Sequence, residues 1–288
     1  ELISQGTVGD LRKIVVNLAL PAVLFTSFLE VDFDANDAAI VVVTFAICVV
    51  LHGAGRVLQP RFGAGHEYFP FLMTGFESGM LGISLFGSAY GLSRVGYFAV
   101  VDLGHELYIW FVFLALLLAR RDGIQTPGRL LGAFIRSPVI IAILAGIAAS
   151  LLGWRDALYD GLIVGGVMNT LVFLAALTVP LILLIVGYGI SLDRQGAREA
   201  LIPVSIRLAI VLPFALLLPV LLMNSLLDGN EYAQAALFTL LILPPPFIIP
   251  LYMKPGMRDE QRYVNNVLSL YTIISIGLFV AYVALNPL

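Results

Sequence analysis

The segment VDLGHELY carries three side chains that can exchange protons or bind cations. Asp102, His105 and Glu106 are three and four residues apart, so a helix places all three on one face. Two carboxylates beside an imidazole suit a proton or ion relay that faces an outer vestibule. The alternative is a solvated helix face near a membrane interface, balanced by water or by Arg94. The residues leave both interpretations open.

Glu77 is a second candidate, because it lies inside the glycine-rich apolar stretch LMTGFESGMLGISLFGSAYG at 72–91. An ionisable group at the depth of a bilayer is costly and usually functional. Desolvation favours the protonated carboxyl group, which would make Glu77 a proton carrier coupled to a substrate. Two alternatives stay open: an ionised Glu77 that pairs with a cation, and a structural Glu77 that hydrogen-bonds to exposed backbone.

A run of prolines predicts a second irregular segment. The stretch ILPPPFIIP at 242–250 cannot form a continuous helix, because each proline removes a donor and disfavours helical geometry before it. Broken backbone at membrane depth persists where it is buried or lines a watery cavity, and two such breaks indicate a transporter's binding site. The residues expected to contact substrate or ion near the two breaks are Glu77, Ser78, Gly79, Ser84, Pro246 and Pro250.

Two further polar residues lie within apolar segments. Arg207 can extend its long side chain to the cytoplasmic interface, or it can anchor a carboxylate of Glu77 or of a substrate. Asn17 precedes Pro21 by four residues and can bond the carbonyl that the proline leaves without a donor, or contact the substrate. Structural and binding roles both remain open for these residues.

The composition places all these groups in a membrane. Hydrophobic residues make up 60% of the 288 residues and charged residues 12%, whereas a soluble domain is nearer half and a quarter. Apolar stretches of about 20 residues predict spanning helices rather than the alternating strands of a barrel. We therefore expect an all-α polytopic membrane protein. Its apolar segments are 12–32, 37–58, 68–91, 94–119, 137–153, 173–192, 200–226, 232–253 and 261–286.

The region 158–172 is glycine-rich and amphipathic, so it either extends the sixth segment or lies along the interface. The net charge of −3 is too small to indicate a nucleic-acid partner. The single cysteine, Cys48, excludes a disulfide within the chain and makes a cysteine-based metal site improbable. The chain opens as a loop entering a helix, so we expect a further segment upstream.

The basic residues predict the orientation. With the start of the first segment inside, alternation places every Lys and Arg on the cytoplasmic side except Arg94, Arg155 and Arg207. This distribution follows the positive-inside rule. We therefore expect an integral protein of the plasma membrane, the inner membrane in a bacterium, with cytoplasmic basic loops and the C-terminus outside.

An internal repeat is also visible. LALPAVL at 18–24 and LTVPLIL at 177–183 share a proline flanked by leucines at equal spacing, in helices that run in opposite directions. Each half of the chain also contains one interrupted segment. These features are typical of an inverted-topology repeat, with residues 1–122 and 123–288 as its two halves within one transmembrane domain.

These motifs resemble the auxin efflux carrier family of the bile/arsenite/riboflavin transporter superfamily. The family's NTGFxGLPLxxxxYG corresponds to ESGMLGISLFGSAYG at 77–91, and its PLxLLxxG to PLILLIVG at 180–187. RLAIVLP at 207–213 and TIIS at 272–275 match two further family helices. The resemblance implies ten helices in a five-plus-five inverted repeat with two crossed broken helices, the first helix preceding residue 1.

The resemblance also implies a function. Its members are secondary transporters of organic anions such as auxin or dicarboxylates, so we expect alternating access with H⁺ or Na⁺ coupling, no other cofactor, and a small-molecule substrate. The scaffold helices of such folds often form a homodimer. This chain departs from the family at the crossing, where asparagine and proline are replaced by Glu77 and Ser84, and an expected asparagine by Pro250.

Other classes are weighed against this expectation. A Na⁺-coupled bile-acid-type symporter or cation-binding transporter would cluster acidic and asparagine ligands at both breaks, where only Glu77 qualifies. A membrane sensor on a transporter fold would usually bring a soluble domain. The His-Glu pair at 105–106 lacks the second histidine of a zinc protease, because that position is Ile109. We therefore expect neither an enzyme nor a metal centre.

Overall fold

The computed structural model describes residues 4–30, 35–122, 138–178, 194–222, 224–227, 229–254 and 256–288, with 128, 136, 180–181 and 184–185 as short pieces. Within this part of the chain the regular elements are helices and none is a strand, which confirms the expected all-α class. In chain order the α-helices are α1 (Gln5–Ile14), α2 (Leu20–Leu29), α3 (Ala35–Phe62), α4 (Phe69–Leu72), α5 (Ile83–Tyr90), α6 (Val95–Tyr108), α7 (Leu114–Asp122), α9 (Pro138–Leu151), α10 (Arg155–Asp160), α11 (Leu162–Ala176), α13 (Arg194–Leu222), α14 (Glu231–Ile242) and α15 (Arg258–Leu285).

Short turns of other helix types connect several of these helices. The π-helical turn η1 (Val15–Ala19) joins α1 to α2, η2 (Ser78–Gly82) leads into α5, and η4 (Ile109–Phe113) joins α6 to α7. The 3₁₀ turn η3 (Leu92–Arg94) precedes α6, and the 3₁₀ turn η5 (Ile249–Leu251) follows the three consecutive prolines. The π turns keep the backbone helical, so α1–α2 and α6–α7 act as two long, continuous helices.

Five helical runs among the described residues are long and apolar enough to cross a membrane. They contain 24 to 30 residues, whereas the hydrocarbon core of a bilayer requires about 20. Five of the expected segments are thereby confirmed as long helices, and the chain is a membrane protein. These runs are Gly6–Leu29, Ala38–Phe62, Leu92–Arg121, Gly196–Leu222 and Arg258–Leu285.

The remaining expected segments are shorter helices or interrupted ones. The segment at 137–153 corresponds to α9, and those at 68–91 and 232–253 are broken, as the glycines and prolines predict. The region 158–172 contains the end of α10 and most of α11, and α11 continues to Ala176. In the rest of the expected segment 173–192, residues 179, 182–183 and 186–192 lie outside the described residues, and with them half of the motif at 180–187.

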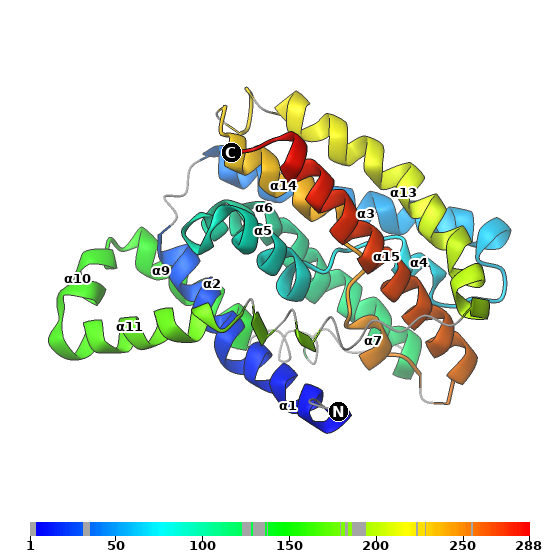
Figure 1. Cartoon of the computed structure of the whole chain (residues 1–288), viewed down its shortest axis with the longest axis horizontal. Coiled ribbons are helices and arrows are strands. Elements are labelled where there is room, and N and C mark those ends of the chain that lie inside the picture. The colour runs from blue at the N-terminus through cyan, green and yellow to red at the C-terminus, as the bar shows by residue number, and fades with distance from the viewer. Residues whose placement is uncertain are drawn as a thin grey trace.

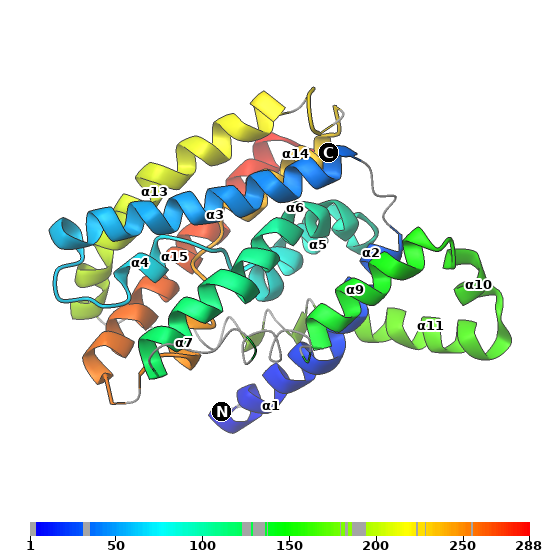
Figure 2. The ribbon, with the colours of Figure 1, turned by 180° about the vertical axis from the view of Figure 1, so that it is seen from behind.

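The helices gather into two groups (Figures 1 and 2). In the first, the small bundle, α2 packs against α9 and α11. In the second, the large bundle, α3 packs on α6, α6 on α14, and α13 on both α14 and α15. Contacts of α2 with α6 join the two bundles. Both bundles combine helices from early and late in the chain, while the inverted relation between residues 1–122 and 123–288 stays a prediction.

Candidate functional site

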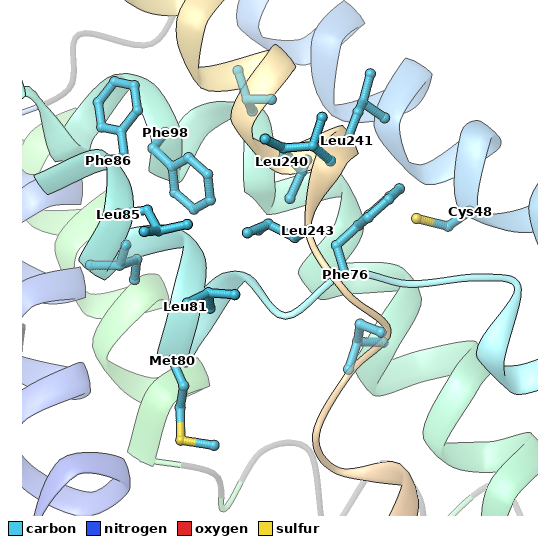
Figure 3. Close-up of a cluster of buried hydrophobic side chains, with 14 of the residues drawn as sticks. Cys48, Phe76, Met80, Leu81, Leu85, Phe86, Phe98, Leu240, Leu241 and Leu243 are labelled. Atoms are coloured by element: carbon cyan, nitrogen blue, oxygen red, sulfur yellow. The ribbon is translucent and has the colours of Figure 1, made fainter. Parts of the chain in front are cut away.

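Two interrupted helices meet inside the large bundle. The first interruption, residues 73–77, separates α4 from η2, and the second, residues 243–248, separates α14 from η5. Figure 3 shows the two non-helical segments passing each other beside Phe76. The backbone N–H of Glu77 donates to the carbonyl of Pro244 at 2.8 Å, so the interruptions are in direct contact. We call residues 73–78 and 243–247 together the crossing.

Two glycines allow the segments to approach so closely. Gly75 has a φ of +68°, and a Cβ there would lie 2.7 Å from Cγ of Pro246. A Cβ at Gly82 would lie 2.7 Å from Cδ1 of Leu243 and 2.5 Å from the ring of Phe98 (Figure 3). A larger residue at either position would push the two interrupted helices apart.

The carboxylate of Glu77 joins both interruptions. It is 7% exposed, and its Oε1 accepts the N–H of Met80 at 3.1 Å, which caps the helix that begins at η2. Its Oε2 accepts the N–H of Phe247 from the second interruption in a short hydrogen bond. A negative group is stabilised at the N-terminal end of a helix, where backbone N–H groups lack partners. These bonds support the structural interpretation of Glu77 given by the sequence.

Arg207 of α13 supplies donors to the same crossing. Its Nη1 donates to the carbonyl of Leu72 at 3.1 Å, and its Nη2 donates to those of Gly75 and Leu243 at 2.6 and 3.3 Å. The side chain is 1% exposed and its guanidinium lies over the ring of Phe76 at 5.1 Å. The interpretation that Arg207 extends to the cytoplasmic interface is wrong, because the interrupted helices present carbonyls that require a donor inside the protein.

The contacts at the crossing replace helical hydrogen bonds. In an unbroken helix the N–H of Phe76 would bond the carbonyl of Leu72, and that of Phe247 the carbonyl of Leu243. Arg207 takes both carbonyls. The Phe76 N–H donates instead to His105 and the Phe247 N–H to Glu77. These four backbone groups therefore keep partners despite the interruptions, as burial in a membrane protein requires.

The cluster of Asp102, His105 and Glu106 lies directly beside the first interruption. Asp102 is 3% exposed and His105 1% exposed, so the interpretation of a solvated helix face is wrong. His105 Nδ1 lies 2.8 Å from Oδ1 of Asp102, and its Nε2 accepts the Phe76 N–H at 2.9 Å. Arg94 does not balance this charge; its guanidinium lies over Tyr232 at 4.5 Å.

Helix α6, which carries the cluster, packs closely against α3. A Cβ at Gly104 would lie 2.0 Å from the carbonyl oxygen of Val41 and 2.2 Å from the hydroxyl of Thr44. Glycine is therefore required where the two helices touch. This contact lies on the side of α6 roughly opposite the cluster, whose own side chains face Phe76 and Ser78 of the first interruption.

The hydrogen bonds of His105 define its protonation. A neutral imidazole has one N–H and one nitrogen lone pair. Because Nε2 accepts from the Phe76 N–H, the proton lies on Nδ1 and is donated to Asp102. The ligand atoms of Asp102, His105 and Glu106 lie within 4.8 Å of one another, but this histidine has no lone pair left for a metal ion. The cluster suits a proton-handling site better than a metal centre.

Ser78 and Pro246 also lie at the crossing. Ser78 is buried and donates to Oε1 of Glu106 at 3.1 Å, and Pro246 packs on Gly75. Gly79 is half-buried at the boundary with the small bundle, where a Cβ would lie 3.8 Å from Leu20 of α2. The structure thus brings Ser78, Gly79 and Pro246 together with Glu77, as expected for one site.

Three expected site residues lie in other surroundings. Ser84 is fully buried and donates to the carbonyl of Met80 in its own helix at 3.0 Å. Pro250 lies in η5, beyond the crossing. Asn17 is exposed and its Nδ2 donates to the carbonyl of Lys13 at 2.8 Å, so the predicted bond to the carbonyl affected by Pro21 is wrong. The helix there widens into η1 before Pro21 instead.

Two residues at the crossing were not expected from the sequence as site residues. Ser275 of α15 donates to the carbonyl of Ile242 at 2.7 Å. In a helix that carbonyl would accept the N–H of residue 246, which proline lacks. Tyr271, one turn earlier, lies under the guanidinium of Arg207 at 5.2 Å. A proline leaves the carbonyl four residues before it without a backbone donor, so Pro246 was the signal that Ile242 needs a donor from elsewhere. Ser275, in the TIIS motif, is that donor.

A cavity of about 620 Å³ lies at the boundary between the two bundles. Its lining includes Thr26 and Ser27 of α2, Val172 of α11 and Val101 of α6. Val101 immediately precedes Asp102, so one wall of the cavity adjoins the buried cluster. Other lining residues are Glu30, Arg94, Tyr97 and Asn230, which give part of the cavity a polar wall.

Comparison with known proteins adds no relative. No family model matches the chain, and it matches no curated protein. The resemblance to the auxin efflux carrier family therefore stays a prediction from sequence motifs. What the chain can do is inferred from the crossing, the buried cluster beside it and the cavity between the bundles.

Proposed function

We propose that this chain is a secondary active transporter that moves a small organic anion across a membrane by alternating access. The observation that carries the proposal is the crossing, where two interrupted helices hydrogen-bond to each other. Interrupted backbone at membrane depth is tolerated where it is buried in the protein or lines a water-filled cavity. Paired interruptions are typical of the binding sites of transporters. The five spanning helices support the membrane setting.

The division into two bundles supports alternating access. The cavity lies at their boundary, and Gly79, which follows the crossing in the chain, faces the same boundary through Leu20. In the proposed cycle the large bundle, which holds both interruptions, moves against the small bundle, so the crossing opens to one side at a time. The five-plus-five inverted repeat inferred from the motifs would give the two open states similar geometry.

The choice of an anion as substrate is supported by the backbone donors at the crossing. Backbone N–H groups of Met80 and Phe247 already hold a carboxylate, that of Glu77. N–H groups at the start of a helix favour anionic ligands generally. Arg94 adds a positive group on the wall of the cavity. Auxin-like acids and dicarboxylates remain the proposed substrates because of the resemblance.

Reconstituted proteoliposomes test this proposal. Uptake of radiolabelled aromatic acids, aliphatic monocarboxylates and dicarboxylates would be measured under an inward proton gradient, an inward Na⁺ gradient and no gradient. We expect accumulation of at least one carboxylate under an ion gradient and none in protein-free vesicles. Glu67→Gln should transport like the wild type, because Glu67 is an exposed carboxylate that pairs at the surface with Arg120.

A Na⁺-coupled symporter is the second candidate, favoured by the oxygen atoms of Asp102, Glu106 and Ser78 that lie together beside the first interruption. Uptake driven by Na⁺ and indifferent to the proton gradient would select it. Uptake of organic cations would exclude the anion proposal. Ligand binding without flux under every gradient would favour a sensor built on a transporter fold.

A further inference from the structure

We infer that Glu106 is the proton-binding residue of this protein and that Ser78 passes its protonation state to the first interruption by reversing one hydrogen bond. The role in coupling rests on the proposed function. The chemistry itself rests only on the contacts among Ser78, Glu106, Asp102 and Trp110.

The two oxygens of Glu106 have different partners. Oε2 accepts the indole N–H of Trp110 at 2.8 Å, and Oε1 accepts the hydroxyl of Ser78 at 3.1 Å. Indole is a donor only, so a proton on Oε2 would break that bond. A serine hydroxyl both donates and accepts. A proton that arrives at Glu106 therefore binds Oε1, and the O–H then donates to Oγ of Ser78.

The hydroxyl hydrogen of Ser78 needs a new acceptor after this reversal. Oγ of Ser78 lies 3.4 Å from Nδ1 of His105, and the same nitrogen lies 2.8 Å from Oδ1 of Asp102, so the Asp102 carboxylate is the acceptor beside Ser78. The proton on Glu106 thus turns the Ser78 hydroxyl from Glu106 to Asp102, and no further proton is gained or lost. Ser78 is the first residue of η2, next to Glu77, so the change occurs within the crossing.

His105 does not carry the proton in this scheme. Its Nε2 is held by the Phe76 N–H and its Nδ1–H by Asp102. A second proton on the ring would require the Phe76 backbone bond to break. Glu106 is also the more accessible residue, since its side chain is partly exposed while Asp102 and His105 are buried. The imidazole instead keeps Asp102 in place as the acceptor for Ser78.

Other charged and titratable groups surround this pair. Asp102 and His105 lie on the same helix and act electrostatically on Glu106. Glu77 lies next to Ser78, and Arg207 of α13 and Cys48 of α3 act on the same cluster. Helix α2 has no titratable side chain, and α14 contributes Glu231 and Tyr232 only at its start. None of these groups touches Oε1 of Glu106 in place of Ser78.

Infrared difference spectroscopy tests the inference without any transport assay. The full-length protein in lipid would be titrated between pH 4 and pH 9 while the C=O stretching band of protonated carboxyl groups is followed. We expect one band that disappears in Glu106→Gln. In Ser78→Ala its titration midpoint should move to higher pH by about one unit, because a charge-assisted donor to the carboxylate is lost.

Matched variants separate this role from a structural one. Ser78→Thr keeps the hydroxyl and should restore the wild-type midpoint. Ser84→Ala removes a buried hydroxyl of the same segment that bonds its own helix, and should change nothing. The inference is overturned if the band persists in Glu106→Gln, or if Ser78→Ala leaves both its position and midpoint unchanged. If transport is measured but the infrared band is absent, the proton site is wrong and the proposed transporter still stands. If the band is present but no transport is measured, the proton site stands and the proposed transporter does not.

Discussion

The two interruptions reach the same hydrogen-bonding pattern from different residues. The first depends on a glycine with positive φ, Gly75, and the second on three consecutive prolines that begin at Pro244. In both, Arg207 takes the carbonyl that a helix would have used. The displaced N–H goes to a neutral imidazole at the first interruption and to the Glu77 carboxylate at the second.

Helix α13 shows that prolines alone do not create such an interruption. It contains Pro203, Pro213 and Pro219 and still runs continuously from Arg194 to Leu222. Single prolines each remove one donor, and neighbouring turns can absorb the loss. Consecutive prolines remove three donors together, and a donor from another helix then takes a freed carbonyl, as Ser275 takes that of Ile242. An interruption therefore requires partners elsewhere in the fold as well as the residues that break the helix.

Arg207→Met should have the largest effect, because it removes the side chain that binds carbonyls of both interruptions. Three carbonyls lose their donor, and we expect a loss of about 3–5 kcal/mol in the free energy of unfolding. Unfolding in mixed detergent micelles followed by circular dichroism would measure it. Arg198→Met, at an exposed site on the same helix, is the control. A loss below about 1 kcal/mol would show that the carbonyls do not need Arg207.

Gly75→Ala should disturb the first interruption nearly as much. The new Cβ would lie 2.7 Å from Pro246 and 2.9 Å from Ile109, in a backbone conformation that disfavours alanine. We expect a loss of about 3 kcal/mol and a lower yield of monodisperse protein. Gly79→Ala is the matched control, since its Cβ would meet only Leu20 at 3.8 Å. Equal behaviour of the two variants in size-exclusion chromatography would contradict this account.

Glu77→Gln should weaken the link between the interruptions. The amide keeps one oxygen acceptor but loses the negative charge, so only one of the N–H groups of Met80 and Phe247 keeps a good partner. We expect a loss of about 2 kcal/mol in the free energy of unfolding. Faster hydrogen exchange at Phe247 than in the wild type would locate the effect. Glu67→Gln should match the wild type, and unchanged exchange at Phe247 in Glu77→Gln would contradict the prediction.

Pro246→Ala should have the smallest effect of the four. Two neighbouring prolines remain, and Ser275 and Arg207 still hold the carbonyls of Ile242 and Leu243. We expect a loss of about 1 kcal/mol, mostly from reduced packing on Gly75. Thermal unfolding of the purified variant measures it. A loss as large as that of Gly75→Ala would show that the second interruption depends on a single residue, as the first does.

Much of this arrangement could be predicted from the sequence. The proline run and the glycines around Glu77 predicted both interruptions, because their effect on the backbone is local. The spacing of Asp102, His105 and Glu106 correctly placed them on one helix face. Of the two interpretations of Arg207, the one that extends it to the cytoplasmic interface was wrong, because its acceptors are carbonyls 132, 135 and 36 residues away in the chain. Partners at such separations leave no local pattern.

The sequence by itself determined the membrane setting, the helical class and the positions where helices break. These follow from apolar length, from the missing donors of proline and from the backbone freedom of glycine, which are properties of short segments. The tertiary structure alone decided which groups satisfy the broken backbone and that Ser78 lies on Glu106. The reason is that a buried polar group without a partner is costly, and only packing determines which partner is near.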